Sequence, residues 1–183
     1  NNNLKKKITY QDIGFNIGPL INSSGRIDKA NDVVELFLSQ NDDKIDKILD
    51  KMNAHNLTRK KIEKEGLDLI DFKKYYNKNV IFIYNKKFHQ GIIGILAAKL
   101  SKIFNKPCFV MTESNKLLKC SIRSGNNVRI NKTINKLLAN KLIISGGGHD
   151  EAGGFTAEKA HVSDIENFLN NEYKILKKKV FQI

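Results

Sequence analysis

Short apolar runs alternate with amphipathic segments over the second half of the sequence, and this alternation restricts the possible folds more than any other feature. The runs NVIFIY, PCFVMT, LLKCSI and KLIIS have the length of buried strands, and EAGGFTAE is typical of an edge or hairpin strand. The segments QGIIGILAAKLSKIF, INKTINKLLAN and VSDIENFLNNEYKIL repeat apolar residues at helical spacing. The pattern predicts an α/β fold, a mixed β-sheet flanked by helices, over residues 77–183.

The first 76 residues have a different pattern. Residues 1–10 have the composition of a solvated tail, and GFNIGPLINSSGRI, with glycines and a proline among apolar residues, is predicted to be a loop packed against a core. From residue 30 to residue 76 the spacing of apolar residues is helical, with a first helix near NDVVELFL and a second that begins near SQNDD and continues as a long, charged helix. We predict that residues 30–76 form a helical connector that bridges two domains.

The net charge of +13 is concentrated in the middle of the chain. Residues 1–76 carry 14 Lys and Arg against 12 Asp and Glu, whereas residues 77–141 carry 13 against one, Glu113. This asymmetry favours a polyanionic partner, because each cation that meets a phosphate releases a condensed counterion. The alternative is a codon bias that places solvated charge on the surface, since 28 of the 32 basic residues are Lys.

The four arginines are more informative than the lysines, because only a guanidinium offers a rigid bidentate fork for phosphate. They are Arg26, Arg59, Arg123 and Arg129.

The sequence shows no apolar run of the roughly 18 residues that a membrane span requires, and its start lacks the apolar core of a signal peptide. Cys108 and Cys120 stand in apolar or mixed surroundings without a CxxC motif. We therefore expect a cytoplasmic protein with no membrane partner and with two buried, free thiols. Because the sequence begins with Asn, we also expect it to be a piece of a longer polypeptide.

The segment SGGGHDEAGGF holds five of the twelve glycines of the chain. Three successive glycines after an apolar run would let backbone amides approach an anion, with His149 as an additional donor. The alternative is a tight turn beside a hydrogen-bonded histidine. The spacing matches neither of the common nucleotide-binding glycine motifs. Asp150 and Glu151 are adjacent, so their side chains diverge, and we expect no metal site here.

Two further segments carry candidate anion-binding residues. FHQGIIGILAAKL places His89 before a helix whose first turns contain Gly91 and Gly94, and a helix N-terminus attracts anions. The glycines equally permit close packing of that helix on the sheet. In KCSIRSG, Ser121 and Arg123 stand two residues apart at a strand end and so project from the same face.

A hydroxyl beside a guanidinium makes a good receptor for a terminal phosphate, and the alternative is a surface Arg paired with an acid. Arg26, with Asn22 beside it in INSSGR, is a similar case in the first part of the chain.

The segments GPLINSSGRI, MNAHNLTRKKIEKE, FHQGIIGILAAKL, CSIRS and GGGHDEAGGF occur in this order, and together they resemble the C-terminal part of the RecJ exonucleases of the DHH phosphoesterase superfamily. The resemblance extends over residues 13–176. It implies that residues 1–29 are the end of a DHH catalytic domain, that residues 30–76 connect the domains, and that residues 77–183 form a DHH-associated substrate-binding domain. It also implies that Mn²⁺ or Mg²⁺ is bound by an N-terminal DHH domain that is missing from this sequence, and that this chain itself holds no metal.

The resemblance assigns roles by position. Asn22 and Arg26 would line the substrate path, Ser121 and Arg123 would anchor the 5′ phosphate, and the motif Gly147, Gly148 and His149 would bind the phosphate being cut. His89 falls on a motif histidine. Phe88 and Gln90 replace the Trp and Pro that commonly flank that histidine, and Ile122 replaces a usual Gly.

The resemblance therefore implies the substrate-binding portion of a single-strand-specific 5′–3′ DNA exonuclease of DNA repair and recombination, a metal-dependent hydrolase. Its partner would be single-stranded DNA, and the fragment alone is expected to be inactive. One alternative is a DHH-type phosphodiesterase of short oligonucleotides or cyclic dinucleotides, which would not need the long connecting helix. Another is a non-catalytic nucleic-acid-binding module.

Overall fold

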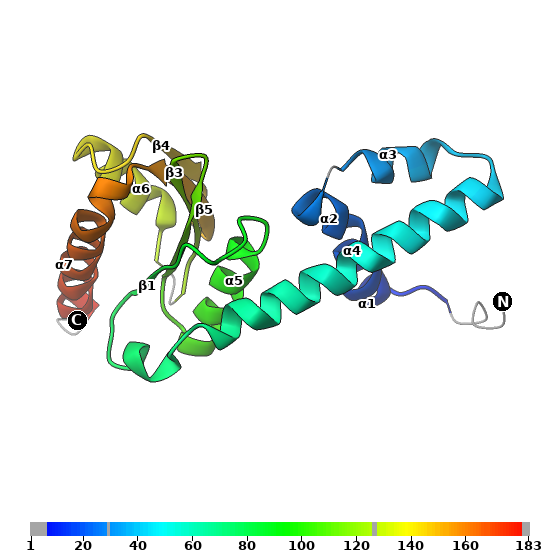
Figure 1. Ribbon diagram of the computed structural model, residues 1–183. Helices are drawn as coiled ribbons and strands as arrows, with labels where there is room; N and C mark the ends of the chain where they lie inside the picture. The colour runs from blue at the N-terminus through cyan, green and yellow to red at the C-terminus, as the bar shows by residue number, and fades with distance from the viewer. Residues whose placement is uncertain (1–6, 29, 126–127, 181–183) are drawn as a thin grey trace. The chain divides into compact units, whose positions relative to one another are not determined.

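The computed structural model describes residues 7–28, 30–125 and 128–180 (Figure 1). Residues 1–6 of the predicted tail lie outside the described residues. The chain divides into two compact units, residues 1–64 and residues 65–183. No helix in the described ranges is long and apolar enough to cross a membrane.

The first unit is helical. It contains α1 (Tyr10–Asp12), a π-helical segment η1 (Ile13–Ile17), α2 (Gly18–Ile27), α3 (Asn31–Leu38) and most of α4 (Asp42–Asp68). The prediction of a loop at GFNIGPLINSSGRI is therefore wrong. Its proline lies in the first turn of α2, and the residues before it already have helical backbone angles in η1. Ser23 and Ser24 of α2 are fully buried, and Ser23 Oγ donates to the Met52 carbonyl of α4 over 3.3 Å.

Helix α4 is one continuous element of 27 residues, in agreement with the predicted long helix. Asn41 caps its start, because Asn41 Oδ1 accepts a hydrogen bond from the backbone nitrogen of Lys44 at 2.9 Å. Asp42 and Asp43 add negative charge to the first turn, where the helix dipole is positive. A short 3₁₀ helix, η2 (Phe72–Tyr75), follows α4 and precedes the sheet.

The second unit contains a five-stranded mixed sheet, so the predicted fold class is confirmed. Its strands are β1 (Ile81–Tyr84), β2 (Cys108–Ser114), β3 (Leu117–Arg123), β4 (Ser145–Gly148) and β5 (Ala152–Ala157). The strand order is β1-β2-β3-β5-β4; β1 and β2 are parallel and the other neighbours are antiparallel.

The prediction for the edge of this sheet is met in part. The segment EAGGFTAE forms a hairpin strand, β5, but β5 lies inside the sheet, and the edge strand is β4. The run KLIIS contributes to β4 with Ser145 alone, and the glycines that follow Ser145 form the rest of the strand. Lys141, two residues after the end of α6 (Ile130–Ala139), has a positive φ of 55°, so the chain turns there instead of beginning a strand.

Helices cover both faces of the sheet (Figure 1). Helix α6 and α7 (Val162–Val180) pack on one face, which carries the main apolar core, and α5 (Ile93–Phe104) lies on the other. We call the second face the α5 face. From β2 to β4, the strand register places the following residues on it: Cys108, Val110, Thr112, Ser114, Leu117, Lys119, Ser121, Arg123, Ala152, Gly154, Thr156, Ser145 and Gly147.

Candidate phosphate-binding site

Ser121 and Arg123 lie on the same face of β3, as their spacing predicts, and their side chains are in contact. Arg123 Nη1 donates to Ser121 Oγ at 3.3 Å and to the carbonyl oxygen of Ile122 at 2.8 Å. Both side chains are half-buried. Ile122 is fully buried on the opposite face, so its side chain does not enter the Ser121 and Arg123 site. The hydroxyl and the guanidinium are thus oriented by β3 itself.

Gly94, in the first turn of α5, brings this helix against the pair. A Cβ at Gly94 would lie 3.2 Å from Ser121 Oγ and 3.5 Å from Arg123 Nη2. The close helix-to-sheet packing that the sequence suggested for this glycine is therefore present, and it occurs directly at the candidate site. The start of α5 and the side chains of Ser121 and Arg123 form one side of the site.

The loop before α5 is anchored by hydroxyl side chains of β2. Thr112 Oγ1 donates to the carbonyl of the buried Phe88 at 2.7 Å, and Gln90 Oε1 accepts from Ser114 Oγ at 2.8 Å. His89, between them, is half-buried, and its Nδ1 accepts a hydrogen bond from the Gly91 nitrogen at 3.1 Å. Since Nδ1 is an acceptor, the neutral ring carries its proton on Nε2, which is the nitrogen that can donate to an anion.

The glycines of SGGGHDEAGGF form strands rather than a loop, and packing explains several of them. A Cβ at Gly146 or Gly153 would meet Ile134 of α6 at 3.0 or 2.6 Å. A Cβ at Gly148 would meet the carbonyl oxygen of Ala152 at 2.4 Å. Close approach of α6 and of the neighbouring strand therefore requires these glycines.

Gly147 is different, because a Cβ there would have no heavy atom within 4 Å. Gly147 lies on the α5 face of β4, and the outer side of β4 pairs with no other strand of the described chain. An edge strand presents backbone N–H and C=O groups that no neighbouring strand uses. Of the three consecutive glycines, Gly147 is thus the one whose missing side chain leaves open space beside the backbone.

The register of the sheet connects the two predicted phosphate sites. Ser121 pairs with Gly154, and Gly154 pairs with Gly147. Arg123 pairs with Ala152, whose carbonyl accepts from the His149 nitrogen at 2.9 Å. Two strand spacings separate β3 from β4, which is about 10 Å. The serine–arginine pair and the glycine–histidine segment are therefore neighbours across a part of the sheet that carries almost no side chains.

His149 itself is exposed, and its Nδ1 lies 3.4 Å from the Glu151 nitrogen. Asp150 does not face a metal partner. Its Oδ2 lies 3.7 Å from Arg129 Nε, and its carbonyl accepts from the Ile130 nitrogen at 3.0 Å at the start of α6. Within residues 7–28, 30–125 and 128–180, no three acidic, histidine or cysteine side chains gather as metal ligands. The described residues therefore do not form a site for a divalent ion; the resemblance assigns that ion to an N-terminal DHH domain.

Asn22 and Arg26 belong to the first unit. They stand one helical turn apart on α2 and so share a face of that helix. Asn22 is exposed and Arg26 is half-buried. The remaining arginine, Arg59, forms a structural pair instead, since its Nη1 lies 2.7 Å from the buried carboxylate of Glu63.

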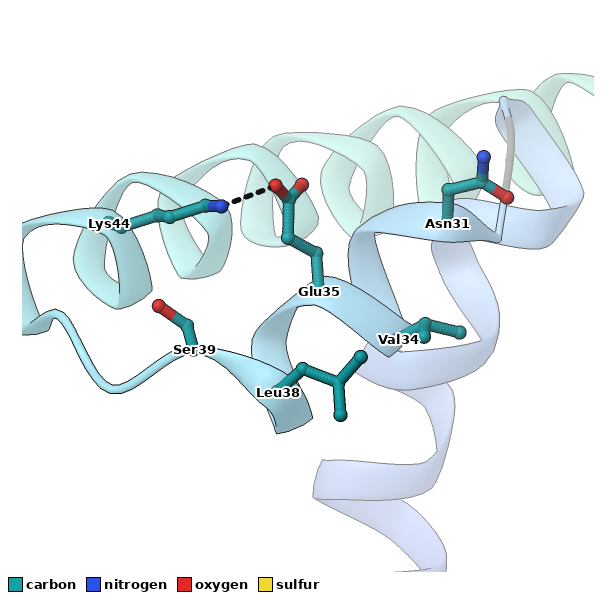
Figure 2. Close-up of a pocket in the computed structure, with 6 residues that line it drawn as sticks. All are labelled: Asn31, Val34, Glu35, Leu38, Ser39 and Lys44. Atoms are coloured by element: carbon teal, nitrogen blue, oxygen red, sulfur yellow. Dashed lines mark ion pairs between the residues drawn. The ribbon is translucent and has the colours of Figure 1, made fainter.

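An open depression of about 560 Å³ lies between α3 and the start of α4 (Figure 2). Its two charged lining residues, Glu35 and Lys44, form an ion pair of 2.6 Å and thus offset each other's charge. None of the residues predicted from the sequence lines it. The lining residues are Asn31, Val34, Glu35, Leu38, Ser39 and Lys44.

Two parts of the α5 face were not predicted from the sequence. Lys119 lies on β3 two residues before Ser121, and Gly154 separates the serine from Gly147. The alternation of side chains along β3 could have indicated Lys119, whereas Gly154 is recognisable only once the pairing of β3 with β5 is known.

Residues 77–178 match the family model of the DHHA1 domain. The chain belongs to the DHHA1 family. The DHHA1 match covers the whole sheet and, with it, Ser121, Arg123, Gly147 and His149.

Relatives extend the similarity beyond the DHHA1 domain. The chain is 28% identical over 176 residues to the single-stranded-DNA-specific exonuclease RecJ of Haemophilus influenzae, an alignment that covers 90% of this chain and 30% of that protein. It is 29% identical over 164 residues to the Escherichia coli K12 protein of the same name, with 84% and 28% covered. The chain thus spans about 30% of the length of these two curated relatives. These matches confirm the resemblance to RecJ.

Solved structures support the fold. The structure of RecJ in complex with Mn²⁺ from Thermus thermophilus is similar with a TM-score of 0.78 at 21% identity, covering 89% of this chain and 24% of that one. An exonuclease RecJ bound to manganese gives a TM-score of 0.77, again at 21% identity, covering 89% of this chain and 41% of that one. The DHHA1 domain and the helices before it therefore have the fold seen in RecJ.

Proposed function

We propose that this chain is the substrate-binding portion of a cytoplasmic, single-strand-specific 5′–3′ DNA exonuclease that acts in DNA repair and recombination. The observation that carries the proposal is the contact between Arg123 and Ser121 on a sheet face whose strand positions hold no acidic residue. The names of the relatives, which are single-stranded-DNA-specific exonucleases, support the choice of substrate.

The proposed mechanism of this chain is binding and orientation. The guanidinium of Arg123 and the hydroxyl of Ser121 would hold the 5′-terminal phosphate through charge-assisted hydrogen bonds. The open backbone at Gly147 and the ring of His149 would receive the next phosphate along the strand, the one to be cut. Nε2 of His89 would donate to the same strand. Asn22 and Arg26, which share a face of α2, are proposed as further phosphate-binding residues.

In this proposal, Mn²⁺ or Mg²⁺ is bound by a DHH domain of the same protein that the given sequence does not include, and the chain alone does not hydrolyse DNA. A bound divalent ion supplies Lewis-acid activation of water for phosphodiester hydrolysis. The share of the relatives that this chain covers, about 30%, is consistent with such a missing domain.

The test is equilibrium binding of the 183-residue chain to a 3′-labelled single strand of about 12 nucleotides that carries a 5′ phosphate or a 5′ hydroxyl. Titrations at about 50 and about 200 mM salt give the number of phosphates engaged. We expect tighter binding of the phosphorylated strand. Removing a charge-assisted contact costs about 1.5–3 kcal/mol, so Arg123→Ala is expected to reduce this preference by roughly ten- to a hundredfold.

Arg123→Lys is the matched variant, because it keeps the positive charge and removes the planar fork. We expect it to retain overall affinity and to lose part of the preference for the 5′ phosphate. Equal binding of both strands by the unmodified chain, unchanged by Arg123→Ala, would contradict the proposed anchor. Hydrolysis of the strand by the chain alone would contradict its assignment as a binding portion.

A further inference from the structure

A second cation stands on the α5 face in line with the proposed anchor. Lys119 and Arg123 both lie on β3, with Ser121 between them, and all three side chains project from the same face. Successive residues of one strand face are about 7 Å apart, so Lys119 lies about 14 Å from Arg123 along β3, which is close to two phosphate spacings of an extended single strand. A strand held at Arg123 thus has a cation within reach of a later phosphate.

The residues that pair with Lys119 across the neighbouring strands, which together with it we call the Lys119 row, supply hydroxyl groups. Lys119 pairs with Thr156 of β5, and Thr156 pairs with Ser145 of β4. Thr156 is half-buried, and Lys119 and Ser145 are exposed. A hydroxyl can donate a hydrogen bond to a phosphate oxygen, and an ammonium carries three donors. This row therefore has the chemistry of an anion site.

No ion pair within the described residues offsets the positive charge of Lys119. Within the part of the chain that the structure describes, Lys119 forms no ion pair, and the strand positions of the α5 face hold no acidic residue. Glu113, the acid of residues 77–141, lies on the other face, where its carboxylate pairs with Lys159 at 2.7 Å. The strands thus offer an anion on the α5 face two cations and no carboxylate; the acid that directly follows β5 is Glu158, in an extended conformation.

We propose that Lys119, Thr156 and Ser145 form a subsite for an internal phosphate of the single strand whose 5′ end is held at Ser121 and Arg123. The inference rests on the proposed function for the identity of the strand. In this proposal the bound DNA strand crosses β3, β5 and β4. Its terminal phosphate lies at Ser121 and Arg123, and a later phosphate lies at the Lys119 row. The nearly bare strands β5 and β4 leave room for the sugars between these two positions.

The experiment uses Lys119→Gln, which removes the charge and keeps an unbranched polar side chain. The matched control is Lys174→Gln, which removes the same charge from an exposed position of α7, the helix on the opposite face. Each protein is titrated with the 5′-phosphorylated and the 5′-hydroxyl strand at several salt concentrations. Loss of one phosphate contact lowers the slope of log K against log salt by about 0.7 for a single strand.

We expect Lys119→Gln to lower this slope by about 0.7 and to keep the ratio of affinities for the two strands, and we expect Lys174→Gln to change neither. A second series replaces single internal phosphates by uncharged methylphosphonate. At one position, the methylphosphonate should weaken binding of the DNA to the unmodified chain. It should not weaken binding to Lys119→Gln any further, because the two changes remove the same contact.

The Lys119 subsite would be overturned if the two Gln variants had equal salt slopes and responded in the same way to each methylphosphonate. The 5′ anchor would not be affected by that result. The proposed function has a separate readout in the same titrations, the preference of the unmodified chain for the 5′ phosphate. If that preference is missing, the proposed function fails, and the slope comparison still decides whether Lys119 binds an internal phosphate.

Discussion

The Nη1 atom of Arg123 lies 3.3 Å from Oγ of Ser121, and the same atom donates to the carbonyl oxygen of Ile122 at 2.8 Å. These contacts restrict a side chain that otherwise loses much rotamer entropy on binding. A guanidinium that is oriented before the phosphate arrives loses less conformational freedom when it binds. The geometry of the pair, and not the presence of Arg123 alone, should therefore determine how well a terminal phosphate is recognised.

Gly94→Ala tests this dependence on geometry. The added methyl group would lie 3.2 Å from Ser121 Oγ, which is closer than ordinary van der Waals contact, so the pair must shift. Alanine favours a helix over glycine by up to about 1 kcal/mol, and this gain offsets the crowding. We expect a nearly unchanged unfolding midpoint and a preference for the 5′ phosphate reduced severalfold, measured by thermal unfolding and by binding.

The control for this change is Gly14→Ala, because a Cβ at Gly14 meets no heavy atom within 4 Å and lies in the first unit. It should leave the preference for the 5′ phosphate unchanged. An unaltered preference in Gly94→Ala as well would show that the orientation of the pair does not control recognition.

Gly147→Ala and Gly148→Ala separate a binding role from a packing role. The methyl group at Gly147 enters open space, whereas the one at Gly148 would lie 2.4 Å from the carbonyl oxygen of Ala152. We expect Gly148→Ala to destabilise the fold by about 1–3 kcal/mol. Gly147→Ala should change stability by less than about 0.5 kcal/mol, as surface substitutions usually do.

If a phosphate approaches the backbone at Gly147, Gly147→Ala should nevertheless weaken binding of the single strand. Urea denaturation and strand titrations on the same preparations measure the two effects. A Gly147→Ala variant that binds as tightly as the unmodified chain would argue that this glycine has no part in phosphate binding.

Much of the second unit could be predicted from the sequence, because its strands and helices have distinct apolar periods. The same-face placement of Ser121 and Arg123 follows from the two-residue repeat of a strand alone. The row that joins Ser121 to Gly147 could not be predicted, since it depends on β5 pairing with both β3 and β4. Pairing of this kind is decided by contacts between residues distant in sequence.

The two local errors also have physical causes. In GFNIGPLINSSGRI, the proline marks the first turn of α2 rather than a break in the chain, and the glycines adopt helical backbone angles. In the glycine run, glycine carries no strand preference of its own, and the close approach of α6 and β5 makes the segment a strand. In both cases tertiary packing overrides the usual secondary-structure preferences of glycine and proline.

The pair of Glu113 and Lys159 should make a small contribution to stability that depends on pH. The Lys159 ammonium, with the Tyr84 hydroxyl second, lowers the pKa of the Glu113 carboxyl from its ordinary value of 4.5. The folded form therefore binds this proton less readily than the unfolded form. The contribution is fully present above the ordinary pKa and is lost as pH falls through the lowered pKa of the folded protein.

Lys159→Gln removes the largest cause of that shift. We expect its unfolding midpoint to lie slightly below that of the unmodified chain at pH 7, and the difference should shrink as the pH is lowered from about 5 to about 3. Thermal unfolding across this range measures the effect, with Lys174→Gln as the control for the loss of one charge. A difference that stays constant with pH would show that Lys159 stabilises the fold by something other than its pairing with Glu113.

The two cysteines should be unreactive in the folded protein. Cys108 and Cys120 are buried and free, as the sequence suggested, and burial raises the pKa of both thiols. A thiol reagent needs the thiolate, so neither residue should react at about pH 8 until the sheet opens. Cys108 lies beneath α5 on the face that carries the candidate site, whereas Cys120 lies in the core against the other face.

Single Cys108→Ala and Cys120→Ala variants therefore report on the two layers separately. We expect Cys108, retained in Cys120→Ala, to react faster than Cys120 at low denaturant, because it needs only α5 to detach from the sheet. A bound 5′-phosphorylated strand that contacts Ser121 and Arg123 beside α5 should slow the reaction of Cys108 and leave that of Cys120 unchanged. Equal rates for both cysteines, or fast reaction of Cys108 without denaturant, would show that α5 does not protect this face as an independent layer.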